Sequence, residues 1–258
     1  MGLRSMCRHC APGGLLCALL LFAAGSALAQ GGPPMVTDDP GTPGNGHWEI
    51  NLGAISSRDL SGRRELAAPD FDINYGWGEH IQLKADIPWT TAHDPGQTSR
   101  AGLGEGDFGV KWRFVDEETS GYALSTYPQY SHAMLGSSTR RGITGAGHSF
   151  FLPLELSADV GHGFSIASEV GRNFVSDGGK NEWVAGFVLQ HDCAEGLECL
   201  AEIHQTQVAR EHQTLLNFGV HWKLQQSLTL LAAAGRELGT RTEERLQSLV
   251  YVGLQFTH

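Results

Sequence analysis

Apolar and polar residues alternate along most of the chain beyond residue 47. The stretch GDFGVKWRFVDEE, Gly106–Glu118, shows this most clearly, because Phe108, Val110, Trp112 and Phe114 occupy every second position. Aspartate, glycine, lysine and arginine lie between them. Successive side chains of a β-strand point to opposite faces. The stretch is therefore expected to form a strand with one apolar and one polar face, followed by an acidic turn.

Comparable segments recur to the end of the chain. They predict an all-β protein of about 12 strands, near residues 48–54, 70–75, 81–87, 106–114, 122–130, 150–157, 164–171, 183–189, 197–206, 216–223, 228–234 and 250–256. The segment 228–234 alternates poorly and reads as a helix on local propensity, but we expect a strand there.

The connections between these segments alternate in length. Short ones span 76–79, 116–121, 159–163, 191–196 and 225–226, and longer ones span 57–66, 90–102, 131–148, 174–181, 207–213 and 235–245. An up-and-down antiparallel barrel with turns at one end and loops at the other produces this alternation. Outer-membrane barrels have short periplasmic turns and longer extracellular loops.

The first 29 residues have the features of a cleaved signal peptide. Arg4 and Arg8 precede the short apolar run Leu15–Ala24, and Ala27–Ala29 is a small-residue cleavage site. The mature chain is then expected to begin at Gln30. No later run is apolar and long enough for a membrane helix, so the exported chain is either soluble or a closed β-barrel.

Aromatic residues favour the membrane barrel over a soluble barrel with an apolar interior. They cluster at both strand ends, as in the aromatic belts at the two lipid interfaces. At the short-turn end are Trp48, Tyr75, Trp77, Phe114, Tyr122, Phe164, Trp222 and Phe256, and at the long-loop end are Trp89, Tyr130, Phe150, Phe174 and Trp183. The apolar face is thus expected to meet lipid, and the polar face to line the lumen.

The predicted lumen carries many charged residues. They are Glu49, Asp70, Asp72, Lys84, Asp86, Lys111, Arg113, Glu155, Glu169, Glu182, Glu202 and Lys223. They form either an electrostatic lining that selects solutes by charge or a salt-bridge network that fills a narrow barrel. Across the whole chain, 28 acidic residues outnumber 18 lysines and arginines. This balance disfavours nucleic acid as a partner, and an open lumen would favour cations or neutral solutes.

Two smaller features have alternative interpretations. Asp38 and Asp39 lie in the Pro/Gly-rich segment 30–46, which is either a plug that enters the lumen of the barrel, residues 47–258, or an ordinary turn. Cys193 and Cys199 are expected to form a disulfide across a periplasmic turn after export. Together with His191 they offer too few ligands for a metal site, and we expect no metal and no cofactor.

Enzymatic activity is not expected from the motifs. The sequence contains no HExxH and no GxSxG motif. The adjacent pairs Ser131–His132 and His148–Ser149 cannot form dyads in a strand, because neighbouring side chains point opposite ways. A lipid hydrolase in the outer membrane is therefore a less favoured alternative.

Particular motifs resemble a known family. They are PPMVTDDPGTPGNGHWEINLG, Pro33–Gly53, then DFDINYGWGEHIQLKADIPW, GLGEGDFGVKWRFVDE, SFFLPLEL, WVAGFVLQ, AEIHQT and VGLQFTH. The sequence resembles the outer-membrane transporter family described under the MetA pathway of phenol degradation, with VTDDPGTP and GVKWRF as the most specific parts. The resemblance implies a channel for uptake of aromatic compounds and brings no catalytic residues. The chain ends QFTH, whereas outer-membrane barrels often end on an aromatic residue.

These observations predict a transmembrane up-and-down β-barrel in the outer membrane of a Gram-negative bacterium. We expect a channel for passive uptake of small solutes, with phenol-type compounds suggested by the resemblance. The alternatives are a closed or structural barrel, an outer-membrane lipid hydrolase, and a soluble periplasmic barrel that binds an apolar ligand. Expected partners are outer-membrane lipid, a small-molecule solute and, during insertion, the barrel-assembly machinery. The sequence leaves the oligomeric state open.

Overall fold

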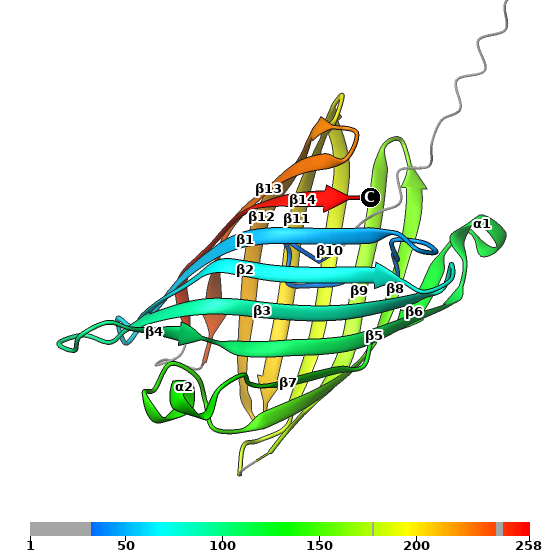
Figure 1. Ribbon diagram of the computed structural model, residues 1–258. Helices are drawn as coiled ribbons and strands as arrows, with labels where there is room; N and C mark the ends of the chain where they lie inside the picture. The colour runs from blue at the N-terminus through cyan, green and yellow to red at the C-terminus, as the bar shows by residue number, and fades with distance from the viewer. Residues whose placement is uncertain (1–31, 177, 241–244) are drawn as a thin grey trace, which may run out of the picture.

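The computed structural model describes residues 32–176, 178–240 and 245–258, so the expected leader, residues 1–29, lies outside the described residues. A closed antiparallel barrel dominates the fold (Figure 1). Its strands are β1 (Trp48–Asp59), β2 (Arg64–Gly76), β3 (Ile81–His93), β4 (Arg100–Leu103), β5 (Glu105–Val115), β6 (Ala123–Thr126), β7 (Gln129–Ala133), β8 (His148–Gly161), β9 (Phe164–Val175), β10 (Glu182–Ala194), β11 (Leu197–Val208), β12 (Glu211–Gln225), β13 (Leu228–Gly239) and β14 (Leu246–Thr257).

These fourteen segments form twelve barrel strands. β4 and β5 are one strand interrupted at Gly104, and β6 and β7 are one strand interrupted at Tyr127 and Pro128. Each strand pairs with its sequence neighbours, and β1 pairs with β14 to close the ring. The predicted all-β up-and-down barrel of about 12 strands is confirmed.

Side chains alternate across the wall as the sequence pattern predicts. In β10, buried Val184 and Val188 alternate with exposed Trp183 and Phe187. In β5, Lys111 is buried inside the barrel while its neighbours Val110 and Trp112 are exposed. The outer surface is thus apolar, whereas the interior holds buried charged residues such as Lys111 beside some apolar ones. An apolar outer surface is suited to lipid.

Both predicted aromatic groups lie on or near the outer surface at the two barrel ends. Tyr75 is less exposed than the others and packs against Trp48 with ring centroids 4.6 Å apart. At the other end, the Arg172 guanidinium lies 4.8 Å from the centre of the Trp183 ring. The remaining members with large exposed rings are Trp77, Phe114, Tyr122, Phe164, Trp222 and Phe256 at the short-turn end, and Trp89, Tyr130, Phe150 and Phe174 at the long-loop end.

The connections differ from the predicted ones at the long-loop end. The expected loop 207–213 is a two-residue turn of Ala209 and Arg210 between β11 and β12, because backbone pairing continues after the side-chain alternation has stopped. The predicted loop 57–66 likewise shortens to residues 60–63. The connection between β7 and β8 remains long and contains the one-turn helix α2 (Gly136–Arg140), while α1 (Glu117–Ser120) lies in a turn at the opposite end.

The segment of poor alternation, 228–234, belongs to strand β13. The alternation is poor because the inward-facing Leu231 and Ala233 are apolar and buried, like the residues on the outer face. Both belong to one buried cluster with Met35 of the N-terminal segment. Residues 32–46 run inside the barrel (Figure 1), so this part of the lumen wall packs against protein rather than facing water. No helix among the described residues is long and apolar enough to cross a membrane.

Candidate functional site

The N-terminal segment, residues 32–46, enters the lumen at the short-turn end. The backbone amide of Gly46 donates to the carbonyl of Gly76 at 2.9 Å, and the Thr42 hydroxyl donates to the carbonyl of Glu79 at 2.9 Å. A Cβ atom at Gly76 would lie 1.8 Å from the Gly44 carbonyl oxygen. This close approach of two backbones requires glycine in the barrel wall.

Deeper in the lumen, two charged residues of the barrel wall contact the segment, and Lys111 of β5 is the first of them. Its ammonium group donates to Asp38 Oδ1 at 2.9 Å and to the carbonyl of Asp39. It also lies 3.8 Å from Glu155 Oε2 on β8. Burial alone would raise the pKa of the Asp38 carboxyl, but the ammonium groups of Lys111 and Lys84 outweigh burial and hold that pKa below its ordinary value.

Glu202 of β11 makes the second contact. Its Oε1 accepts the backbone amides of Val36 at 3.0 Å and Thr37 at 2.6 Å. Its Oε2 accepts the Asn217 side-chain amide at 3.1 Å. Glu202 is only 2% exposed, and a buried carboxylate is stable only where hydrogen bonds replace water. The N-terminal segment therefore supplies part of the solvation that this carboxylate needs.

Apolar contacts complete the attachment. Met35 lies in a buried cluster with Ala167, Val188, Leu200 and Tyr251, joined by the two β13 residues already described. The wall also leaves room beside Thr37, because a Cβ atom at Gly186 would lie 2.1 Å from Thr37 Oγ1. The segment thus fits the lumen by charge, by hydrogen bonding and by shape.

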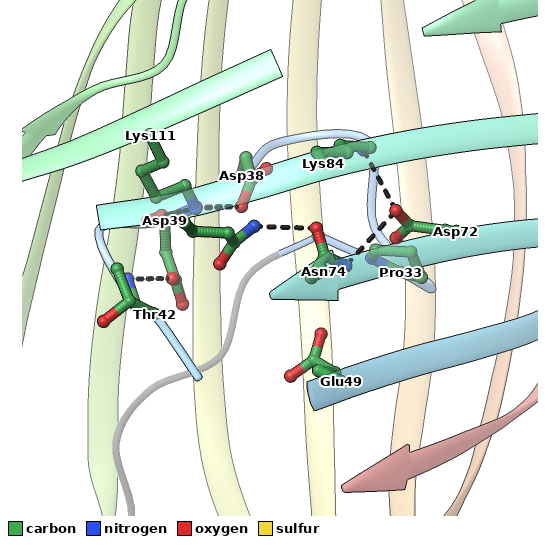
Figure 2. Close-up of a pocket in the computed structure, with 12 residues that line it drawn as sticks. Pro33, Asp38, Asp39, Thr42, Glu49, Asp72, Asn74, Lys84 and Lys111 are labelled. Atoms are coloured by element: carbon green, nitrogen blue, oxygen red, sulfur yellow. Dashed lines mark hydrogen bonds and ion pairs between the residues drawn. The ribbon is translucent and has the colours of Figure 1, made fainter. Parts of the chain in front are cut away.

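The segment divides the lumen into two spaces. A long-loop cavity of about 470 Å³ lies on one side of it, and a short-turn cavity of about 510 Å³ lies on the other. A small pocket of about 30 Å³ shares Gly32, Pro33 and Asp38 with the first and Gly41 and Thr42 with the second. Figure 2 shows this neck with Lys111, Asp39 and Asp72 around it.

The predicted lumen residues fall into three groups by exposure. Asp70, Asp72, Lys111, Glu155, Glu169 and Glu202 are buried, Glu49, Lys84, Asp86, Arg113 and Glu182 are half-buried, and Lys223 is exposed at the short-turn rim. The structure brings some of them together, as in the 3.7 Å ion pair of Lys84 with Asp72 and the Lys111–Glu155 contact. Arg113 instead pairs with Asp116 at 2.8 Å near the turn.

Several neutral lumen residues were not predicted. Tyr127 is fully buried, and its hydroxyl accepts a hydrogen bond from the Gln82 side-chain amide at 3.1 Å. The Lys111 ammonium lies 4.6 Å from the centre of the Tyr127 ring. Asn74 and Asn217 also face the interior and are buried. A signal for Tyr127 exists in the sequence, because it shares the parity of Ser125 rather than that of Tyr130. The same parity places Asn74 with Asp72 and Asn217 with Lys223 on the polar faces of their strands.

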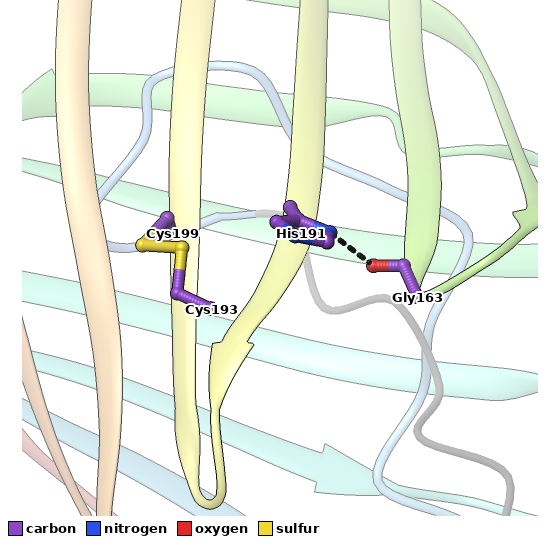
Figure 3. Close-up of a disulfide and its surroundings, with 4 residues drawn as sticks. All are labelled: Gly163, His191, Cys193 and Cys199. Atoms are coloured by element: carbon purple, nitrogen blue, oxygen red, sulfur yellow. Dashed lines mark hydrogen bonds between the residues drawn. A yellow bond between two sulfur atoms is a disulfide. The ribbon is translucent and has the colours of Figure 1, made fainter.

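Cys193 and Cys199 form a disulfide, with an S–S distance of 2.08 Å and a Cα–Cα distance of 5.9 Å (Figure 3). It closes the turn between β10 and β11 at the short-turn end. The nearby His191 stacks on Phe164 with ring centroids 4.0 Å apart, and its Nδ1 lies 3.0 Å from the Gly163 carbonyl oxygen. Among the described residues, no group of three or more histidine, cysteine or acidic side chains could hold a metal ion.

Comparisons with solved structures agree on the barrel. The COG4313 outer membrane channel from Pseudomonas putida F1 matches with a TM-score of 0.66 and 10% identity, covering 89% of this chain and 100% of that chain. KdgM porin matches with a TM-score of 0.56 and 9% identity, covering 81% and 98%. The β-domain of the Bordetella autotransporter BrkA matches with a TM-score of 0.50 and 14% identity, covering 82% and 98%.

These similarities show the fold and leave the function to the site, because one barrel architecture serves channels and an autotransporter alike. No family model and no curated protein matches the sequence. The chain is thus similar to porin-like outer-membrane barrels in architecture. The lumen of this chain holds the N-terminal segment and the charged residues that contact it.

Proposed function

We propose that this protein is a channel in the outer membrane of a Gram-negative bacterium, through which small solutes pass by diffusion, and that residues 32–46 act as its plug. The two lumen cavities, and the neck of about 30 Å³ that shares lining residues with both, carry this proposal. A neck of that size holds about two water molecules. It is too small for an organic solute, so on this proposal such a solute passes only after the plug moves.

The outer surface supports the location. Exposed apolar side chains cover the barrel between two groups of aromatic rings, as expected for a protein with lipid on its outside. The long-loop end then faces the exterior, and the short-turn end, with the Cys193–Cys199 disulfide, faces the oxidising periplasm. The expected leader and the assembly machinery would bring the chain there.

The size of the long-loop cavity supports a small organic solute. Its volume of about 470 Å³ falls in the range of sites that enclose small organic ligands. The resemblance to the phenol-degradation transporters adds an aromatic body as the expected feature of this solute. We include phenol among the solutes to be tested for that reason.

Deleting residues 36–44 tests the plug directly. The deletion removes the contacts with Glu202 and Lys111 and leaves every barrel strand intact. We expect higher conductance in planar bilayers and faster flux of phenol into liposomes than with the full mature chain. The folded band on an unboiled gel verifies the barrel in both samples, because barrels of this kind commonly migrate differently before and after boiling.

The competing function is a structural barrel that conducts no solute. The tight hold on the N-terminal segment favours it, since a permanently fixed segment closes the lumen. If the folded deletion variant conducts no more than the full chain, the plug is refuted. If neither protein conducts above an empty bilayer, the channel is refuted and the structural barrel is supported.

A further inference from the structure

Apolar side chains form part of the lining of the long-loop cavity. They are Met35, Ile55, Phe151, Leu249 and Tyr251. Two of these are aromatic, and Met35 belongs to the plug itself. A small apolar ring can therefore pack against these side chains, because removing apolar surface from water is favourable.

The charged groups around the same cavity are almost all negative. Its carboxyl groups are Asp38, Asp70, Asp86, Glu169 and Glu182, and the one lysine is Lys84. That lysine already pairs with Asp72 outside the cavity lining, and His204 is neutral under ordinary conditions. The five carboxyl groups thus outnumber the one lysine, and the lining of the cavity is acidic.

Glu169 of β9 makes the lining of this cavity different from an ordinary cluster of acidic residues on a protein surface. Its side chain is only 6% exposed and lines the cavity. It makes no hydrogen bond or ion pair with any residue that the structure describes, whereas Glu182 accepts the Asn173 amide at 3.3 Å. A second acceptor, Asp86 Oδ1 on β3, is also buried without a hydrogen-bond partner.

A buried carboxylate without a hydrogen-bond donor is costly. While the group is ionised, its two oxygens accept hydrogen bonds only. A partner that keeps it ionised is therefore a donor, and a cationic donor contributes most. A bare metal ion fits less well, because it needs several converging oxygen ligands, and the described residues contain no such group. The apolar side chains in the same lining instead suit the hydrocarbon part of an organic molecule.

We propose that the long-loop cavity binds a small organic cation, with an ammonium group at Glu169 and an apolar, preferably aromatic, body against Phe151, Tyr251 and Met35. This deepens the proposed function, because the bound cation is taken to be the solute that waits above the plug. A ring that carries a carboxylate would meet the acidic lining and be rejected. Contact of the solute with Met35 would also place it directly on the segment that closes the channel.

The test is a calorimetric titration of the full mature chain folded in detergent micelles, with blank titrations into empty micelles subtracted. Three probes share one ring and differ in charge, namely benzylamine, benzyl alcohol and benzoate. We expect benzylamine to bind about tenfold or more tighter than benzyl alcohol, the effect of one charge-assisted hydrogen bond, and benzoate not to bind. Equal affinities for benzylamine and benzyl alcohol would overturn the proposal.

Glu169→Gln assigns the site and Glu211→Gln serves as its control. Both changes remove one negative charge, but Glu211 is exposed at the start of β12, at the long-loop end of the barrel. We expect the first to remove the preference for benzylamine and the second to preserve it. Unchanged affinity in folded Glu169→Gln refutes the site, and if that variant does not fold, the charge order of the unaltered protein still decides.

This binding experiment is independent of transport. A protein that prefers benzylamine in micelles but conducts nothing in bilayers, even without its plug, retains the cation site and loses the channel. A protein that conducts after plug deletion but shows no charge preference retains the channel and loses the cation site.

Discussion

Removing the carboxylate of Glu202 is expected to release the plug while leaving the barrel intact. Glu202 holds the N-terminal segment through the backbone amides of Val36 and Thr37. In Glu202→Ala these two amides lose their acceptor in the docked state but regain water when the segment undocks. The substitution therefore weakens docking specifically, because the strand pairing of β11 uses backbone groups that do not change.

The magnitude follows from the two hydrogen bonds. Each hydrogen bond to a charged group contributes about 1.5 kcal/mol at the lower end of the measured range, so together they contribute about 3 kcal/mol to docking. Every 1.4 kcal/mol changes an equilibrium constant tenfold, which gives an undocked-to-docked ratio raised about 100-fold. Loss of the contact with Asn217 affects both states and is left out of this sum.

Single-channel recording in planar bilayers measures the effect as the fraction of time spent in the open state. Glu195→Ala, in the exposed turn between β10 and β11, is the matched control and should leave that fraction unchanged. The decisive comparison combines Glu202→Ala with deletion of residues 36–44. If Glu202 acts by holding the plug, the substitution adds nothing once the plug is absent. An equal increase in both backgrounds would refute the reasoning.

Three further predictions concern the plug and the barrel. Gly186→Ala introduces a Cβ atom 2.1 Å from the docked segment, so it should raise conductance, whereas Gly145→Ala, with no atom within 4 Å, should not; equal conductance of the two variants would contradict this. Replacing both cysteines of the β10–β11 disulfide by serine should lower the free energy of unfolding in urea by about 2 kcal/mol through loop entropy without changing conductance, and unchanged unfolding would show that this closed turn adds no stability. The pKa of Asp38 is lowered in the folded protein, so its contact with Lys111 persists above the unfolded pKa and is lost only as pH falls through the folded pKa. Conductance recorded from pH 7 to pH 5 should therefore show no opening due to this group. Opening in that pH range that disappears in Asp38→Asn would contradict this.

The sequence predicts the lumen residues only in part. Period two alone indicates which face of a strand each charged side chain takes, since parity fixes that face. Parity does not predict which of these charged side chains contact each other, because it does not say which strands face each other across the lumen. Lys111 illustrates this, as it contacts Asp38, 73 residues away in sequence, and approaches Glu155 on another strand. The interpretation of Asp38 and Asp39 as a simple turn or as a plug could likewise not be decided locally.

The sequence by itself determined the strands, their two faces and their up-and-down order. It could do so because a strand exposed to lipid on one side and water on the other must alternate residue by residue, and because backbone groups in a membrane must be paired within the wall. Tertiary structure alone decided what fills the lumen. Glu202 and Val36 are 166 residues apart, and Leu231 breaks the alternation of its strand because Met35 covers it. Contacts between a segment and a wall so distant in sequence depend on how the ring closes, and no local pattern encodes that geometry.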